Sequence, residues 1–117
     1  MHEIGLCSGI LDAVVARAGD RPVVGVTVRA GAILRAEPEA MRQAFGLVAA
    51  GSVADGAALE LITDPVAVTC RTCGAVTTVA DPLAVCGRCG SADVDLTGGD
   101  GLVLKSLTFA APAATRS

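Results

Sequence analysis

Four of the five cysteines stand in two matched pairs, and this spacing has a clear chemical meaning. Cys70 and Cys73 form one Cys-x-x-Cys turn, the first knuckle, and Cys86 and Cys89 form the second knuckle after 12 intervening residues. A glycine follows each pair and tolerates the positive φ that such a bend often needs. Two knuckles facing each other bring four thiolates to one centre, a tetrahedral set that suits zinc. Because four thiolates leave no open position for water, we expect structural Zn(II).

The same sulfurs admit other interpretations. A rubredoxin-like iron site shares the spacing and would make the protein a small electron carrier, although aromatic residues are absent around the knuckles. Redox chemistry of a dithiol is a second alternative, but it is more typical of a lone Cys-x-x-Cys than of two matched pairs. A zinc ribbon that binds nucleic acid or a protein complex is a third.

The chain's single histidine is residue 2, where it can chelate a metal together with the amino terminus. Its large side chain predicts that Met1 is retained with a free α-amine. That amine, the amide nitrogen of His2 and its imidazole Nδ1 close two adjoining chelate rings around one ion, which suits Ni(II) or Cu(II). Glu3 can add its amide nitrogen or its carboxylate. The fourth position stays exchangeable, which is typical of a carrier rather than an enzyme.

Two amphipathic helices are predicted to position these residues. Apolar side chains recur at helical spacing over 4–18. Glu37-Pro38-Glu39 opens a second helix, because proline is preorganised for the first turn and carboxylates favour the positive end of the helix dipole. The predicted apolar residues are Ile4, Cys7, Ile10, Leu11, Val14, Val15 and Ala18 in the first helix, and Met41, Phe45 and Val48 in the second. Cys7 is interpreted as a small core hydrophobe.

Strands are predicted at 23–30, 58–63 and 102–109, where apolar residues alternate or cluster. In the first of these, Val24, Val26 and Val28 are expected on one face, and Thr27 and Arg29 on the other. We therefore expect an α/β fold, in which two helices cover a mixed three-stranded sheet and a zinc-ribbon-like domain is inserted.

The expected domain boundaries follow from a change in composition. Residues 1–66, completed by the returning strand 102–109, would form the α/β domain with the N-terminal nickel chelate. Residues 67–98 would form the zinc domain, which has too few large apolar side chains for a core of its own. Metal binding can supply the missing folding free energy, about 10–16 kcal/mol in small zinc peptides. Residues 110–117 are expected to be a loose tail.

Composition argues against several classes of function. A net charge of −3 and an aromatic content of 2% disfavour a nucleic-acid binder, which needs a basic surface or stacking side chains. No apolar run approaches the ~20 residues that span a bilayer, and the first residues do not read as a signal peptide, so a cytoplasmic protein is expected. No motif places a base beside a nucleophile, so no enzyme is expected.

Taken together, these residues resemble the HypA/HybF family, nickel metallochaperones of [NiFe]-hydrogenase maturation and, in some bacteria, of urease. The resemblance covers nearly the whole chain and rests on these segments: Met1-His2-Glu3, Leu6-Cys7, Pro38-Glu39, Ala44-Phe45, Gly56-Ala57-Ala58-Leu59, the two knuckles and the strand from Leu102 to Leu107. It implies His2 as an essential Ni(II) ligand supported by Glu3, and a zinc domain held by the four paired cysteines. It also implies a HypB-type GTPase, the [NiFe]-hydrogenase large-subunit precursor and urease accessory proteins as partners.

Overall fold

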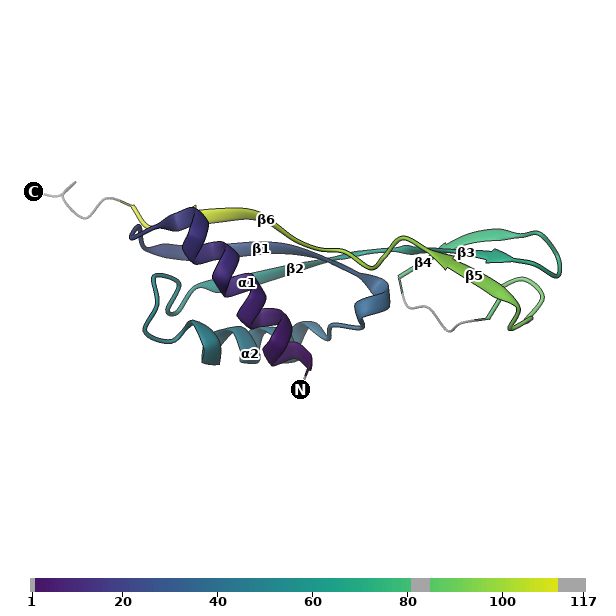
Figure 1. Cartoon of the computed structure of the whole chain (residues 1–117), viewed down its shortest axis with the longest axis horizontal. Helices are drawn as coiled ribbons and strands as arrows, with labels where there is room; N and C mark the ends of the chain where they lie inside the picture. Colours follow the sequence, from purple (N-terminus) through teal and green to yellow (C-terminus); the bar gives the residue numbers. More distant parts are fainter. Residues whose placement is uncertain (1, 81–84, 112–117) are drawn as a thin grey trace, which may run out of the picture. The chain divides into compact units, whose positions relative to one another are not determined.

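The part of the chain that the structure describes folds into two helices and two three-stranded sheets (Figure 1). A computed structural model describes residues 2–80 and 85–111. The elements are α1 (His2–Ala18), β1 (Val23–Gly31), a short 3₁₀ turn η1 (Ala32–Leu34), α2 (Pro38–Ala49), β2 (Ala58–Asp64), β3 (Val66–Cys70), β4 (Val76–Val79), β5 (Val94–Thr97) and β6 (Leu102–Phe109). One sheet has the order β2-β1-β6 and the other β4-β3-β5. The predicted α/β class, with two helices and a three-stranded sheet, is confirmed.

Two compact units divide the chain. The helical unit comprises Met1–Val28, Glu37–Glu60 and Leu104–Ser117, and the cysteine unit comprises Arg29–Ala36 and Leu61–Val103. The division falls within β1, β2 and β6. The domain boundaries proposed from the sequence stay a prediction, and most of the expected tail at 110–117 lies outside the described residues.

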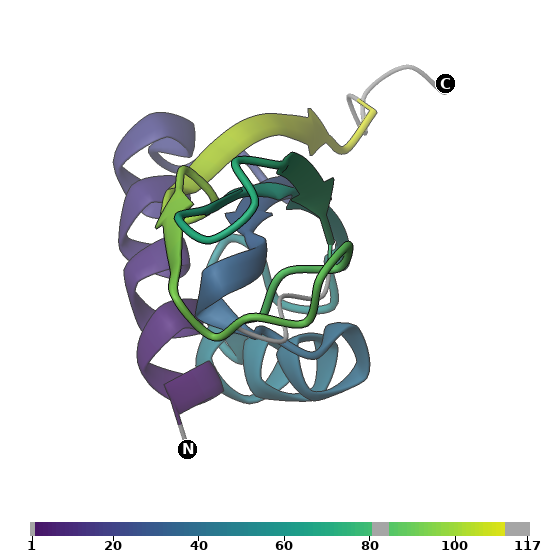
Figure 2. The ribbon, with the colours of Figure 1, turned by 90° about the vertical axis from the view of Figure 1, so that its right-hand side faces the viewer.

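Helices α1 and α2 of the helical unit pack against each other (Figure 2). Cys7 is fully buried, and its Sγ lies 3.4 Å from the carbonyl oxygen and 3.9 Å from the Sδ of Met41. Buried side chains are Cys7, Ile10, Val14 and Ala18 in α1, and Met41, Ala44, Phe45 and Ala49 in α2. The core role predicted for Cys7 is therefore confirmed, whereas Val15 is 42% exposed and lies off the buried stripe.

Helix α2 begins with the cap that its sequence predicts. The Glu37 carboxylate accepts hydrogen bonds from the backbone N–H groups of Glu39 and Ala40, at 2.8 and 3.1 Å, and Pro38 occupies the first turn. This satisfies two of the donors that a helix start leaves without partners. Within residues 2–80 and 85–111, neither helix has the length and apolar character needed to cross a membrane.

Strand β1 follows the predicted alternation except at its start. Val26, Val28 and Ala30 are buried, as the alternation predicts. Val24, however, is 49% exposed and Val23 is buried, so the phase changes near Gly25. A Cβ at Gly25 would lie 3.2 Å from the Thr108 Cβ, so the absent side chain allows a close approach there.

The cysteine unit contains an antiparallel sheet with β3 at its centre. Val66 opposite Val79 begins the β3–β4 pairing, and Cys70 opposite Val94 ends the β3–β5 pairing. Because Cys70 is the last residue of β3 and pairs with Val94, the first knuckle lies beside the start of β5.

Candidate metal centre

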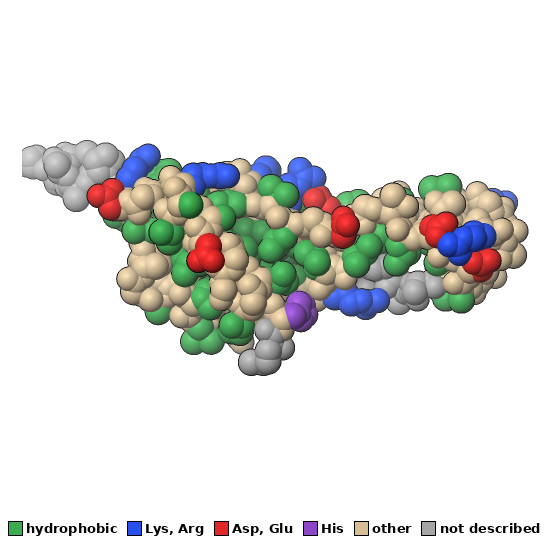
Figure 3. All heavy atoms as spheres, viewed as in Figure 1, with side chains coloured by type: hydrophobic (Ala, Val, Ile, Leu, Met, Phe, Trp, Pro, Cys, Tyr) green, Lys and Arg blue, Asp and Glu red, His purple; other side chains and the backbone are tan. Residues whose placement is uncertain are grey.

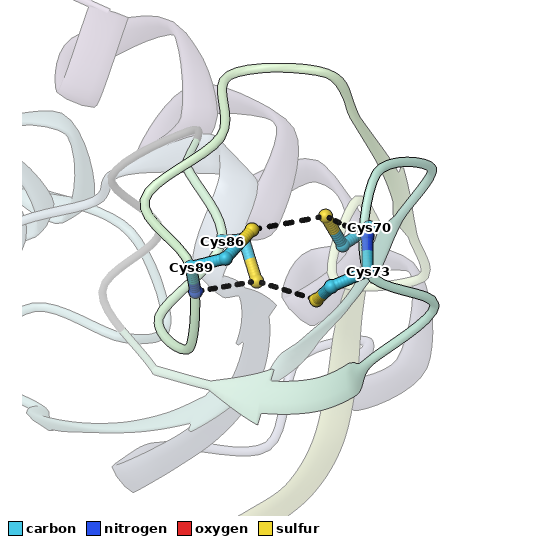
Figure 4. A group of neighbouring side chains, drawn as sticks. All are labelled: Cys70, Cys73, Cys86 and Cys89. Atoms are coloured by element: carbon cyan, nitrogen blue, oxygen red, sulfur yellow. Dashed lines mark hydrogen bonds between the residues drawn. The ribbon is translucent and has the colours of Figure 1, made fainter.

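The four paired cysteines converge on one point in the cysteine unit (Figure 4). Their Sγ atoms all lie within 4.8 Å of one another. The Cys70 and Cys89 sulfurs are 3.6 Å apart, and the Cys73 and Cys86 sulfurs are 3.7 Å apart. Tetrahedral zinc with Zn–S bonds of about 2.3 Å requires S···S distances of about 3.8 Å. The donor set therefore fits one tetrahedral ion of this size.

Backbone N–H groups of each knuckle point at its first sulfur. The Cys70 Sγ accepts from the N–H groups of Thr72 and Cys73, both at 3.3 Å. The Cys86 Sγ accepts in the same way from Arg88 at 3.3 Å and from Cys89 at 3.4 Å. Such donors stabilise negative charge on sulfur, as a bound thiolate requires.

A glycine closes each turn by adopting the left-handed conformation. Gly74 has φ +77° and donates its N–H to the Cys70 carbonyl at 3.0 Å. Gly90 has φ +79° and donates to the Cys86 carbonyl at 2.8 Å. The positive φ predicted after each Cys-x-x-Cys pair is confirmed, and the two turns have the same construction.

The thiol pKa values favour a cation at the centre of the cluster. The backbone N–H of Cys73 is the main cause that lowers the pKa of Cys70 to about 6, and the N–H of Cys89 likewise lowers that of Cys86. At Cys89 the Ser91 backbone N–H lowers the pKa, but the neighbouring sulfurs and desolvation outweigh it and raise the value to about 12. Two sulfurs thus ionise readily, while a third resists ionisation beside them unless positive charge lies at the centre.

Each knuckle presents one buried and one exposed sulfur-bearing residue. Cys70 and Cys86 are 2% and 3% exposed, whereas Cys73 and Cys89 are exposed. Four sulfur ligands would complete the tetrahedral coordination of zinc and leave no position for substrate. Such an arrangement is typical of a structural centre.

The other predicted metal ligands lie at the start of α1, in the helical unit. His2 is the first described residue and its side chain is 53% exposed (Figure 3, purple). Its Nδ1, the atom expected to chelate, lies 3.6 Å from the Glu3 Oε1. Met1, the third predicted ligand, lies outside the described residues. The structure thus brings His2 and Glu3 side by side, and their role with nickel stays a prediction.

Sequence reasoning missed a set of polar contacts beside the four sulfurs. Arg71, inside the first knuckle, forms ion pairs with Asp93 and Asp95. The neighbouring Thr72 hydroxyl lies 2.8 Å from that of Ser91. The Asp-x-Asp spacing, which puts both carboxylates on one side of an extended segment, was the signal available in the sequence.

Comparison with known proteins gives one consistent result. Residues 1–109 match the model of the family described as hydrogenase/urease nickel incorporation, metallochaperone, HypA. The hydrogenase maturation factor HypA of Acidithiobacillus ferrooxidans is 34% identical over 110 residues, which is 92% of this chain and 97% of that protein. The factor of the same name from Rhodopseudomonas palustris is 36% identical over the same share of each chain.

Two solved structures share the fold. The solution structure of the Ni metallochaperone HypA from Helicobacter pylori has a TM-score of 0.58 and 23% identity, covering 94% of this chain and 98% of that one. A second solution structure of a HypA protein has a TM-score of 0.54 at 22% identity and covers 93% of each chain.

Proposed function

Because the chain belongs to the HypA family of hydrogenase and urease nickel-incorporation metallochaperones, we propose that it binds Ni(II) at its amino terminus and delivers it to an enzyme under maturation. In this proposal Ni(II) is cargo and Zn(II) is resident. Delivery proceeds by ligand exchange, so the protein catalyses no reaction on a substrate. The observation that carries the proposal is the start of α1 at His2, with the imidazole exposed.

The backbone at this helix start suits a nickel chelate. The first N–H groups of an α-helix have no acceptor within the helix. The amide nitrogens of His2 and Glu3 can therefore lose a proton to a metal without breaking a helical hydrogen bond. The exposed His2 Nδ1 supplies the imidazole donor, and the Glu3 carboxylate, 3.6 Å from it, can support the ion. Met1 would contribute its α-amine.

The four sulfurs of Cys70, Cys73, Cys86 and Cys89 would hold Zn(II). Bound zinc would link the two knuckles and thereby stabilise the cysteine unit. No exchange step is assigned to it, because four thiolates occupy its coordination sphere. In this proposal zinc stabilises the fold, while nickel is transferred from the amino terminus to the recipient.

The partners follow from the cargo. We propose a HypB-type GTPase as the protein that acts with this chain in nickel delivery, and the [NiFe]-hydrogenase large-subunit precursor as the recipient. Urease accessory proteins are proposed as partners where urease is the client. We propose the cytoplasm as the location, because the recipient is a precursor that is still being assembled.

Metal analysis of the tag-free protein tests the nickel site. We expect one nickel and one zinc per chain in the wild type, and His2→Ala should lose nickel while keeping zinc. Ser8→Ala, at an exposed position of α1, is the matched control and should bind both metals. Nickel affinity should fall with pH, because the amide nitrogens must lose protons to bind. Unchanged nickel affinity in His2→Ala would refute the proposed carrier site.

A further inference from the structure

Polar side chains tie the first knuckle to the segment that follows the second. The Arg71 guanidinium forms ion pairs with the carboxylates of Asp93 and Asp95. The Thr72 hydroxyl lies 2.8 Å from the Ser91 hydroxyl. Both Arg71 and Thr72 stand between the two cysteines of the first knuckle, so two consecutive residues anchor that turn at two separate points.

The same segment, residues 91–95, holds both knuckles through its backbone. The Ser91 carbonyl accepts from the Cys86 N–H at 2.7 Å, and the Asp93 carbonyl accepts from the Arg71 N–H at 2.9 Å. The Ser91 hydroxyl also accepts from the Asp93 N–H at 3.1 Å. None of these contacts involves a metal. We call residues 71–72 and 91–95 with these contacts the knuckle latch.

The relative orientation of the two knuckles decides which metal geometry the sulfurs can offer. Each knuckle supplies two sulfurs, which define a plane with the metal. Perpendicular planes give the tetrahedron typical of zinc, whereas coplanar ones give the square plane typical of Ni(II). Converting the tetrahedron into the square plane requires one knuckle to rotate by a quarter turn relative to the other. Anchors at both Arg71 and Thr72 oppose this, because turning about one contact breaks the other.

Two of the S···S distances between the knuckles favour the tetrahedral arrangement. With bonds of about 2.3 Å, a square plane has S···S edges of about 3.3 Å and diagonals of about 4.6 Å, whereas every edge of a tetrahedron is about 3.8 Å. Of the four S···S distances between knuckles, the one from Cys70 to Cys89 is 3.6 Å and the one from Cys73 to Cys86 is 3.7 Å, and both lie closer to the tetrahedral edge than to the edge of the square.

We propose that the knuckle latch is a specificity determinant, which keeps the four sulfurs tetrahedral and so excludes Ni(II) from the zinc centre. The inference rests on the proposed function, since it takes zinc as resident and nickel as cargo. A protein that receives Ni(II) at one site must prevent its own thiolates from capturing it. The latch meets this need without covering the cluster, in which the residues Cys73 and Cys89 are exposed.

Arg88 provides a matched control for the charge of Arg71. It stands between the cysteines of the second knuckle, as Arg71 stands between those of the first. Its backbone N–H donates to the Cys86 Sγ, whereas the N–H of Arg71 donates to the Asp93 carbonyl. Its side chain makes no ion pair or hydrogen bond with any other residue in 2–80 or 85–111. Arg88→Gln therefore removes the same charge beside the cluster while sparing the latch.

The experiment adds excess Ni(II) to the zinc-loaded full chain carrying His2→Ala, so that the cysteines alone report on nickel. Zinc and nickel are counted after desalting, and thiolate-to-nickel charge-transfer absorption identifies sulfur-bound nickel. The parent should keep zinc without this absorption. Arg71→Gln should raise the nickel-to-zinc ratio about tenfold and Thr72→Val about fivefold, with Arg71→Lys in between and Arg88→Gln at the parent value.

Equal ratios in Arg71→Gln, Thr72→Val and Arg88→Gln would overturn the latch while leaving the proposed zinc site intact. If Arg71→Gln fails to fold, the nearly isosteric Thr72→Val decides, and a parental ratio in it overturns the inference. Absence of zinc from the wild-type protein as purified would overturn the proposed function, and the latch with it.

Discussion

An alanine at Gly31 should destabilise the cysteine unit, because the backbone passes too close there for a side chain. The Gly31 N–H donates to the Gly101 carbonyl at 2.8 Å, and the Ile33 N–H donates to the Gly99 carbonyl at 2.8 Å. A Cβ at Gly31 would collide with the Gly99 carbonyl and the Asp100 nitrogen. These are backbone atoms, so no side chain can rotate away, and the two segments must separate.

The expected magnitude follows from the contacts that separation would break. Overpacking of a closed site costs about 1–3 kcal/mol, and each of the two strained hydrogen bonds contributes about 0.5–1.5 kcal/mol. Gly31→Ala should therefore lower the free energy of unfolding by about 2–6 kcal/mol. For Gly46→Ala we expect the opposite, an increase in the free energy of unfolding. Gly46 is exposed within α2 with open space at its Cβ position, so alanine should stabilise by about 0.5–1 kcal/mol.

Urea unfolding of the three proteins at one fixed zinc concentration measures both effects. Zinc is held constant because a metal that binds the folded state changes the apparent stability by mass action. Far-UV circular dichroism reports on the helices of the zinc-loaded proteins. In a separate series, at one fixed cobalt concentration and without zinc, the cobalt–thiolate absorption reports on the cysteine unit. A midpoint for Gly31→Ala within the error of wild type would show that the segments at Gly31 and Gly99 do not approach as described.

Three further predictions concern titration and helix capping. Burial raises the pKa of the Cys7 thiol to about 11, so iodoacetamide at about pH 8 should leave Cys7 unmodified by mass spectrometry, and the stability it contributes should be lost as pH rises through about 11. Because the pKa of Cys70 is about 6 and that of Cys89 about 12, zinc binding at about pH 8 should release fewer protons than four thiols carry. The number of protons released should rise, and zinc affinity should fall, as pH drops through about 6. Calorimetry in buffers of different ionisation enthalpy measures the number of protons released. Glu37→Ala should cost about 0.5–2 kcal/mol in urea unfolding, because it removes the cap of α2.

Local sequence signals were sufficient to predict most elements of the fold. Pro38 and the capping Glu37 marked the start of α2, and the glycine after each knuckle marked a left-handed turn. The cysteine spacing predicted the convergence of the four sulfurs, because a Cys-x-x-Cys-Gly turn is a local structure that needs little help from the rest of the chain.

Other features depend on contacts between distant segments, which a local pattern does not contain. Val15 and Val24 match the apolar periods of their elements, yet they are 42% and 49% exposed, because which apolar residues are covered depends on the segments packed over them. The ion pairs of Arg71 with Asp93 and Asp95 join residues more than 20 positions apart. The spacing of the two aspartates is visible in the sequence, but their partner Arg71 is identified only by the pairing of β3 with β5.

Both proposed metal sites depend on backbone N–H groups that regular secondary structure leaves free. In the knuckles, the N–H groups of Cys73 and Cys89 donate to sulfur and favour the thiolate, so the backbone keeps its protons and strengthens permanent ligands. At the start of α1, the N–H groups of His2 and Glu3 lack helical acceptors, so their nitrogens can bind a metal after losing a proton. Reprotonation then offers a route to release. Under the proposed function, the backbone amide thus has two roles. Where its N–H donates to a cysteine sulfur, it stabilises the ligand of the resident zinc; where its nitrogen loses the proton, it is itself a ligand of the exchangeable nickel.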